Sequence, residues 1–106
     1  MGFDESALSN KAKEIYDKLR NVMDPEIGIS ITEMRLIDEI KVEGKKASIT
    51  YHLSAPFCPP QFALYIGKEI KLKTQSIKGI EDIEVTLKDH MRADQINKSL
   101  REGQAS

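Results

Sequence analysis

The single cysteine of the chain, Cys58, lies in the segment SAPFCPPQF, between Pro56 and the pair Pro59-Pro60. Proline is favoured at the first position of a helix, so Pro59 there makes Cys58 the predicted N-cap of a following helix. A thiol at a helix N-terminus faces unpaired amide groups and the positive end of the helix dipole, and both favour the thiolate. The segment therefore predicts a rigidly held thiol with nucleophilic or metal-binding character. The alternative is a half-buried cysteine that only packs.

A catalytic role for this cysteine would need a base, usually histidine, and a third group that orients the base. His52 and His90 are the two histidines of the chain. Strand alternation predicts that His52 faces solvent, opposite the apolar residues of its strand, and His90 is predicted in a loop before a helix. No nucleophile signature at fixed spacing is present. A cysteine-dependent enzyme is therefore the weaker interpretation, and we expect no catalytic residues.

Metal binding by Cys58 is a second interpretation. A closed zinc or iron–sulfur site usually needs about four ligands, most of them cysteine or histidine. One cysteine per chain cannot supply such a site. The remaining ligands would be histidine or acidic side chains, a small thiol, or Cys58 of a second chain. We therefore expect a labile iron–sulfur cluster or iron, with nothing tightly bound, which suits a carrier or adaptor better than an electron-transfer protein.

Two carboxylates flank a proline in the turn Asp24-Pro25-Glu26. Such residues often cap or terminate a helix. Alternatively, the turn lies near Cys58 and one of the acids serves as a ligand or a proton partner. The sequence leaves both interpretations open.

The elements that must position these residues follow from hydrophobic periodicity. Helical spacing predicts three helices, at about 6–23, 59–77 and 92–100. Period-two alternation predicts strands at about 47–53 and 83–87, and 36–42 is predicted as a strand that precedes the hairpin turn signal Glu43-Gly44-Lys45. The order α-β-β-α-β-α predicts a small single α+β domain, with a three-stranded mixed sheet and helices packed on one face. We expect the domain to span 1–106, with flexible ends at 1–5 and 101–106.

Composition argues against several classes of protein. The 106 residues carry 16 basic and 17 acidic side chains and a net charge of −1, which argues against nucleic acid as a partner. One cysteine cannot form an internal disulfide, which fits the reducing cytoplasm. No run approaches the roughly 18 apolar residues of a membrane span, and the polar N-terminus does not predict a signal peptide.

Taken together, three motifs resemble the SufT/PaaD-type iron–sulfur assembly domain, long known as domain of unknown function fifty-nine. They are Asp24-Pro25-Glu26-Ile27, Ile31 to Ile37, and Leu53 to Pro59, and a strand with Ile83-Glu84-Val85 follows. The resemblance runs from about Ile15 to Leu87, and the tail around His90 and 96–100 is similar to cytosolic iron–sulfur targeting members. It implies an α+β fold and a role in delivering or maturing clusters. The implied partners are the assembly machinery, client apoproteins and, for a shared cluster, a second copy in a homodimer.

The family's residues carry over one by one. Cys58 matches the motif cysteine and becomes the candidate transient metal ligand. Asp24 matches the first acid and Glu26 the second, and Ser54 stands where threonine is common. An adaptor that binds partners without metal at Cys58 is the alternative.

Two departures from the family pattern bear on these expectations. The turn Glu33-Met34-Arg35-Leu36 has arginine where glycine is usual. Arginine does not easily take a positive φ, so we expect either a different turn or a different partner surface here. The tail also lacks the tryptophan of many bacterial members, which favours general assembly over PaaD-like oxygenase maturation.

Overall fold

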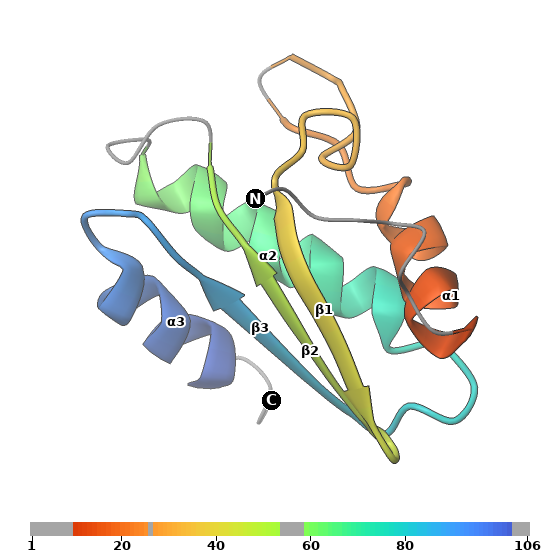
Figure 1. The fold of residues 1–106 in the computed structure, drawn as a ribbon. Helices are drawn as coiled ribbons and strands as arrows, with labels where there is room; N and C mark the ends of the chain where they lie inside the picture. The colour runs from red at the N-terminus through yellow and green to blue at the C-terminus, as the bar shows by residue number, and fades with distance from the viewer. Residues whose placement is uncertain (1–9, 26, 54–58, 103–106) are drawn as a thin grey trace.

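The chain forms three helices and a three-stranded sheet (Figure 1). The structure, a computed structural model, describes residues 10–25, 27–53 and 59–102. Its elements, in chain order, are α1 (Asn10–Leu19), β1 (Ile37–Glu43), β2 (Lys46–Tyr51), α2 (Pro60–Thr74), β3 (Asp82–Leu87) and α3 (Ala93–Glu102). The predicted α-β-β-α-β-α order of a small α+β domain is therefore confirmed.

The sheet is mixed, as predicted. Its strand order is β1-β2-β3, with β1 antiparallel to β2 and β3 parallel to β2. The turn Gly44-Lys45 joins β1 to β2, and Gly44 has the positive φ of 61° that such tight hairpins favour. The parallel pair needs a crossover, and α2 supplies it. One end of the sheet therefore holds the start of β1 and the ends of both β2 and β3 (Figure 1).

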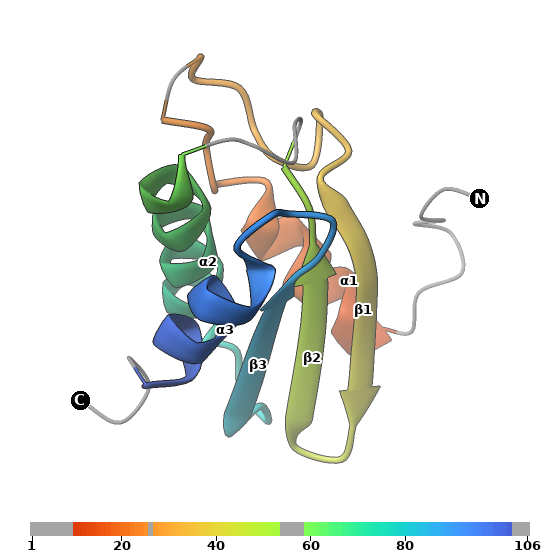
Figure 2. The same ribbon diagram turned by 90° about the vertical axis from the view of Figure 1, so that its left-hand side faces the viewer.

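The core lies between the apolar face of the sheet and the helices (Figure 2). Alternate residues of β2 and β3 are buried, as period two predicts: Ala47, Ile49, Tyr51, Ile83, Val85 and Leu87. The Tyr51 hydroxyl donates to the Ala63 carbonyl of α2 at 2.6 Å. Burial of Tyr51 raises the pKa of its phenol well above the ordinary value of 10.0. A hydrogen bond buried in the core thus ties the sheet to its crossover helix.

The third helix protects the outer edge of β3. The Asn97 side chain accepts a hydrogen bond from the Leu87 N–H at 2.7 Å and donates to the Leu87 carbonyl at 3.0 Å. One amide thus pairs both backbone groups that a further strand would pair. Gly67 of α2 allows the close approach of α3, because a Cβ there would lie 2.7 Å from Leu100 Cδ2.

The first helix is shorter than its periodicity predicts. It ends at Leu19 instead of Met23, and Met23 forms an isolated antiparallel bridge with Ser30. Val22 nevertheless stays fully buried, so the apolar period continues past the helix. The prediction was wrong at this end because the N–H groups of residues 20–22 bond to carbonyls three residues earlier, so buried Val22 continues the apolar period from a tight turn and not from an α-helix. The expected start, at residue 6, lies outside the described residues.

Candidate functional site

Three connections join the sheet at one end, which we call the loop end: 20–36 precedes β1, 52–59 follows β2 and 88–92 follows β3 (Figures 1 and 2). The His52 N–H donates to the Leu36 carbonyl at 2.9 Å, which ties the second connection to the first. The Lys88 N–H donates to the Tyr51 carbonyl at 2.9 Å, which ties the third to the end of β2. Backbone bonds therefore fix the roots of all three connections relative to one another.

Asp24 opens a short hairpin in the first connection. Its N–H donates to the Ile29 carbonyl at 2.9 Å, and its carbonyl accepts from the Gly28 N–H at 2.9 Å. Gly28 has a φ of 70°, which fits the tight reversal. Asp24 Oδ1 accepts from the Ile27 N–H at 3.3 Å, so the carboxylate holds its own turn. Asp24 therefore has a structural role, although it starts a hairpin and does not end α1.

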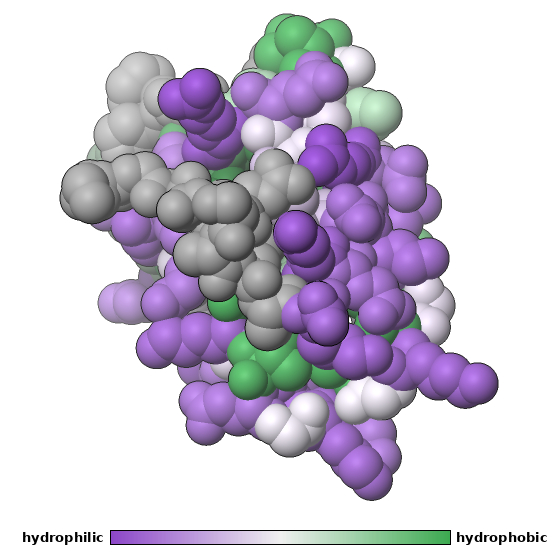
Figure 3. Space-filling view, turned by 45° about the vertical axis from the view of Figure 1, so that its right-hand side comes forward, coloured by the Kyte–Doolittle hydropathy of each residue, from purple (hydrophilic) through white to green (hydrophobic). Residues whose placement is uncertain are grey.

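Apolar side chains are exposed around this hairpin. Met23, Ile27 and Ile29 are 47%, 58% and 42% exposed. Figure 3 shows hydrophobic residues at the end of the molecule that carries this connection, above a largely hydrophilic surface. Exposed apolar groups rimmed by polar residues often mark contact surfaces. The loop end thus presents an acidic turn together with apolar side chains.

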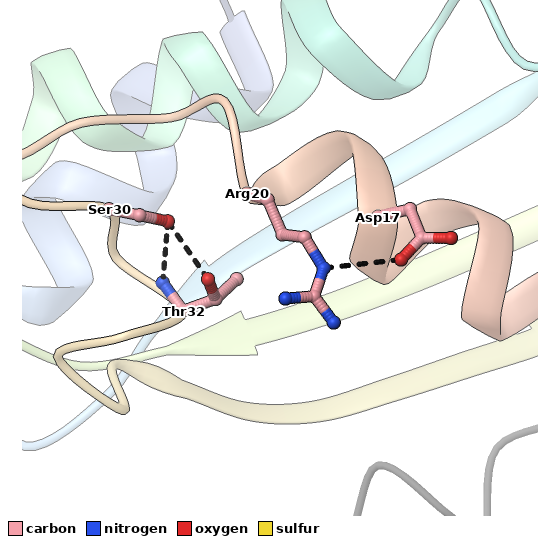
Figure 4. A network of polar contacts seen from close by, with 4 residues as sticks. All are labelled: Asp17, Arg20, Ser30 and Thr32. Carbon is pink, nitrogen blue, oxygen red and sulfur yellow. Dashed lines mark hydrogen bonds and ion pairs between the residues drawn. The ribbon is translucent and has the colours of Figure 1, made fainter.

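The second half of this connection is held by a pair of buried hydroxyls. Ser30 Oγ and Thr32 Oγ1 lie 2.8 Å apart, and the Thr32 N–H donates to Ser30 Oγ at 3.3 Å (Figure 4). Figure 4 also shows the last turn of α1, where Arg20 Nε lies 3.2 Å from Asp17 Oδ1. Each buried hydroxyl thus has a hydrogen-bond partner, and the pair fixes the backbone where the next turn begins.

That next turn ends in a left-handed residue, Arg35. The Leu36 N–H donates to the Ile31 carbonyl at 3.0 Å and the Arg35 N–H to the Thr32 carbonyl at 3.2 Å, the pattern of a Schellman motif. Arg35 has a φ of 59°, so the doubt that arginine could take this conformation was wrong. Ile31 and Leu36 are both buried, and their burial offsets the roughly 1–2 kcal/mol penalty of a non-glycine residue there.

His52 was predicted to face solvent, but it is paired with Asp38. Its Nδ1 lies 2.8 Å from Asp38 Oδ2, and its side chain is 31% exposed. Asp38 sits at a β-bulge between Ile37 and Glu39, and Lys88 Nζ lies 3.7 Å from its Oδ1. A carboxylate on Nδ1 orients the imidazole and leaves Nε2 as the nitrogen available to other partners. The loop end therefore holds an oriented histidine that the sequence analysis missed.

The bulge explains why this pair was missed. Strict alternation from Ile37 would place Ile40 on the opposite face, yet both are buried. The extra residue at the register shift between Ile37 and Glu39 accounts for that arrangement. The spacing of the apolar residues Ile37 and Ile40, three positions apart in one strand, is thus the sequence signal for a bulge. That signal could have indicated that Asp38 turns toward a partner.

His90 has a local role at the start of α3. Its Nδ1 accepts from the Arg92 N–H at 3.0 Å, and its carbonyl accepts from the Ala93 N–H at 3.2 Å. This agrees with its prediction as a loop residue that precedes a helix.

The start of α2 differs from the prediction by one residue. Pro60 is the first helical residue and Pro59 is the N-cap, without a side-chain cap. The assignment of Cys58 as the N-cap is therefore wrong, and the cysteine precedes the cap in the chain. A proline does occupy the first helical position, as predicted, but it is Pro60 and not Pro59.

Three of the four predicted site residues, Glu26, Ser54 and Cys58, lie outside the described residues. Their proximity to Asp24 stays a prediction. Within the described ranges, no three histidine and acidic side chains lie close enough together to hold a metal ion. None of the helices in those ranges is long and apolar enough to cross a membrane.

Comparison with known sequences supports the resemblance. Residues 12–87 match the model of a family described as "Iron-sulfur cluster assembly protein". MJ1129, an uncharacterized protein of Methanocaldococcus jannaschii, is 29% identical over 92 residues, 85% of this chain and 94% of that protein. An Fe-S protein maturation auxiliary factor of Porphyromonas gingivalis is 32% identical over 76 residues, 71% of this chain and 70% of that protein. An iron-sulfur cluster carrier protein of Synechocystis sp. is 31% identical over 67 residues, 63% of this chain but 18% of that longer protein.

Two solved structures share the fold. A DUF59 domain of unknown function from Bacillus anthracis has a TM-score of 0.61 and 19% identity, and the match covers 96% of this chain and 98% of that one. Rv1466 of Mycobacterium tuberculosis, described as associated with Fe-S complex assembly and repair, has a TM-score of 0.51 and 19% identity, covering 96% and 94%. Since the family match spans most of the chain, this protein belongs to the iron–sulfur cluster assembly protein family.

Proposed function

We propose that this protein is a carrier or adaptor, not an enzyme, which matures client iron–sulfur proteins through the thiolate of Cys58. The observation that carries the proposal is the family match over residues 12–87, which includes both the Asp24 turn and Cys58. The roots of the connections that carry these motifs converge at the loop end, which supports a shared site there. The related maturation factor and cluster carrier point to the same process.

In this proposal the cargo is iron or an iron–sulfur cluster, held transiently by Cys58. One thiolate per chain leaves the remaining ligand positions to other donors, so the cargo exchanges readily. Asp24 and Glu26 tune or share the site, and Ser54 supports the loop. A homodimer that contributes two thiolates holds a cluster more firmly than one chain does. The partners are assembly machinery and client apoproteins in the cytoplasm.

The test is anaerobic cluster reconstitution of the wild type and of Cys58→Ala, with Ser76→Ala as a control at the far end of α2. Visible absorbance and iron and sulfide per chain are measured, together with the oligomeric state. We expect cluster bands and bound iron and sulfide in the wild type and in Ser76→Ala only. Cys58→Ala should also fail to restore cluster maturation of client proteins.

The contrary outcomes are distinct. Equal iron and sulfide in the wild type and Cys58→Ala would show that Cys58 is not the ligand. No cargo in either protein, together with client binding that Cys58→Ala retains, would select a metal-free adaptor. Loss of thiol reactivity in both His52→Ala and His90→Ala would instead favour a cysteine-dependent enzyme.

A further inference from the structure

A groove of about 330 Å³ lies between the first turns of α2 and α3. Leu64 and Ile96 contribute its apolar part, and Ile96 is only 4% exposed. Gln61, Gln95 and Ser99 supply amide and hydroxyl groups around it. An apolar surface with a few polar groups around it is the usual composition of a binding groove.

One described lining residue of this groove is charged, and it is a cation, while Asp94 in the first turn of α3 lies outside the lining. Arg92 contributes to the lining, and none of the described lining residues is acidic. Its guanidinium donates to Gln95 Oε1 at a long 3.4 Å, and no carboxylate of the described residues forms an ion pair with it. The first turn of α2 likewise contains no acidic residue and has no side-chain cap, so its dipole adds positive potential. The groove therefore favours an occupant that carries a carboxylate.

We propose that this groove binds an extended acidic–aliphatic segment of a partner protein. A carboxylate of the segment accepts paired hydrogen bonds from Arg92, whose planar fork matches a carboxylate. A neighbouring aliphatic side chain covers Leu64 and Ile96, and the amides of Gln61 and Gln95 pair with the peptide backbone of the segment. The groove begins at Pro60, the first residue of α2, which directly follows the β2–α2 connection in the chain.

This inference extends the proposed function by giving a client protein a docking place, but it does not require that Cys58 bind iron. Two capped hexapeptides probe it: Ac-GDLELG-NH₂, and its uncharged match Ac-GNLQLG-NH₂. Each is titrated into the ¹⁵N-labelled full chain while amide shifts are recorded. We expect the acidic peptide to shift Gln61, Leu64, Gln95 and Ser99, and the uncharged one to bind at least tenfold more weakly. Arg92→Gln should weaken the acidic peptide by about tenfold or more, because a charged hydrogen-bonded pair is lost.

Arg101→Gln is the matched control, since it removes the same charge from the exposed end of α3 without touching the groove. Equal weakening by both variants would show a general charge effect and overturn the proposal, as would equal binding of the two peptides. Groove shifts that grow with protein concentration in the absence of peptide would assign the surface to a second copy instead. Cys58→Ala should bind the acidic peptide as the wild type does, and Arg92→Gln should load iron and sulfide as the wild type does. Failure of the groove proposal can therefore be told apart from failure of the Cys58 cargo proposal.

Discussion

At the scale of the residue, Arg35 holds a backbone conformation that glycine adopts more easily. Its φ is 59°, and its side chain is exposed at the end of the Schellman turn. The left-handed region costs a residue with a Cβ about 1–2 kcal/mol, whereas glycine's extra freedom in the unfolded chain costs about 0.5–1 kcal/mol. Arginine at this position of the Schellman turn therefore lowers the free energy of unfolding relative to glycine.

We expect Arg35→Gly to raise the free energy of unfolding by about 0.5–1 kcal/mol, because the steric penalty exceeds the added unfolded-state entropy. Urea unfolding followed by circular dichroism measures the change. Arg35→Ala is the control, since it removes the guanidinium but keeps the Cβ, and it should not stabilise the protein. A gain of the same size in both variants would mean that the side chain, and not the backbone, carries the strain.

The phenol of Tyr51 is a second residue whose environment has a measurable consequence. Burial raises the pKa of Tyr51 in the folded chain above its ordinary value of 10.0. Above that ordinary value the unfolded state loses a proton that the folded state keeps, so stability falls as the pH rises. Below it, both states keep the proton and Tyr51 contributes no slope.

We predict that Tyr51→Phe flattens the decline of stability between about pH 10 and pH 11, by up to about 1.4 kcal/mol per pH unit. At neutral pH the same variant should lose about 1 kcal/mol with the hydrogen bond to Ala63. Denaturant unfolding at a series of pH values gives both quantities. Tyr65→Phe, at an exposed position, should keep the wild-type slope. Identical slopes in the wild type and Tyr51→Phe would contradict the prediction.

At the scale of the element, α3 is attached to the sheet by the side-chain amide of Asn97, which hydrogen-bonds the outer backbone edge of β3. Asn97 satisfies the Leu87 N–H and carbonyl at the outer edge of β3. Lys71 of α2 holds the last turn of α3, because its Nζ donates to the Leu100 carbonyl at 2.6 Å. Burial lowers the pKa of Lys71, and the charge of Asp82 opposes that shift. Polar contacts at the middle and in the last turn of α3 thus position it beside α2, where the groove lies.

Asn97→Ala should lower the free energy of unfolding by about 1–3 kcal/mol, because it leaves two partly buried backbone groups of Leu87 unpaired. Hydrogen exchange at the Leu87 amide should accelerate more than exchange at β2 amides. Lys98→Ala, on the exposed face of the same helix, is the control and should change neither quantity. Unchanged exchange at Leu87 in Asn97→Ala would show that packing alone holds α3.

At the scale of the whole molecule, the sheet separates two ends of different character. The loop end gathers the three connections, while the Gly44-Lys45 hairpin turn lies at the far end of β1 and β2. Each of these strands extends by about 3.3 Å per residue, so the two ends are about 20 Å apart. Cargo bound through the β2–α2 connection would therefore lie close to one end only.

This separation predicts a polarised response to iron. Anaerobic titration of Fe²⁺ into the ¹⁵N-labelled protein should broaden the amides of Asp24, His52 and Lys88, and leave Gly44 and Lys45 sharp, because paramagnetic broadening falls steeply with distance. Cys58→Ala should abolish the broadening. Broadening of equal strength at the hairpin turn would place the iron elsewhere and contradict a site at the loop end.

Most of the elements were predictable from sequence because their signals are local. Alternation in β2 and β3 and the glycine of the hairpin turn depend on neighbours along the chain. The family resemblance, carried by the motifs around Asp24 and Cys58, also needed only the sequence, and the match over residues 12–87 confirms it. The helix ends were less predictable, since the bridge of Met23 to Ser30 competes with a further helical turn.

The order of elements, the buried faces of β2 and β3 and the family therefore follow from the sequence alone. The tertiary structure decided which residues from distant elements meet: His52 with Asp38 through a bulge, and Asn97 with the edge of β3. It also decided that Arg35 takes a left-handed conformation, because burial of Ile31 and Leu36 outweighs a local preference. The physical reason is that periodicity records which face of an element is buried, whereas pairing between elements depends on register and packing that no local pattern contains.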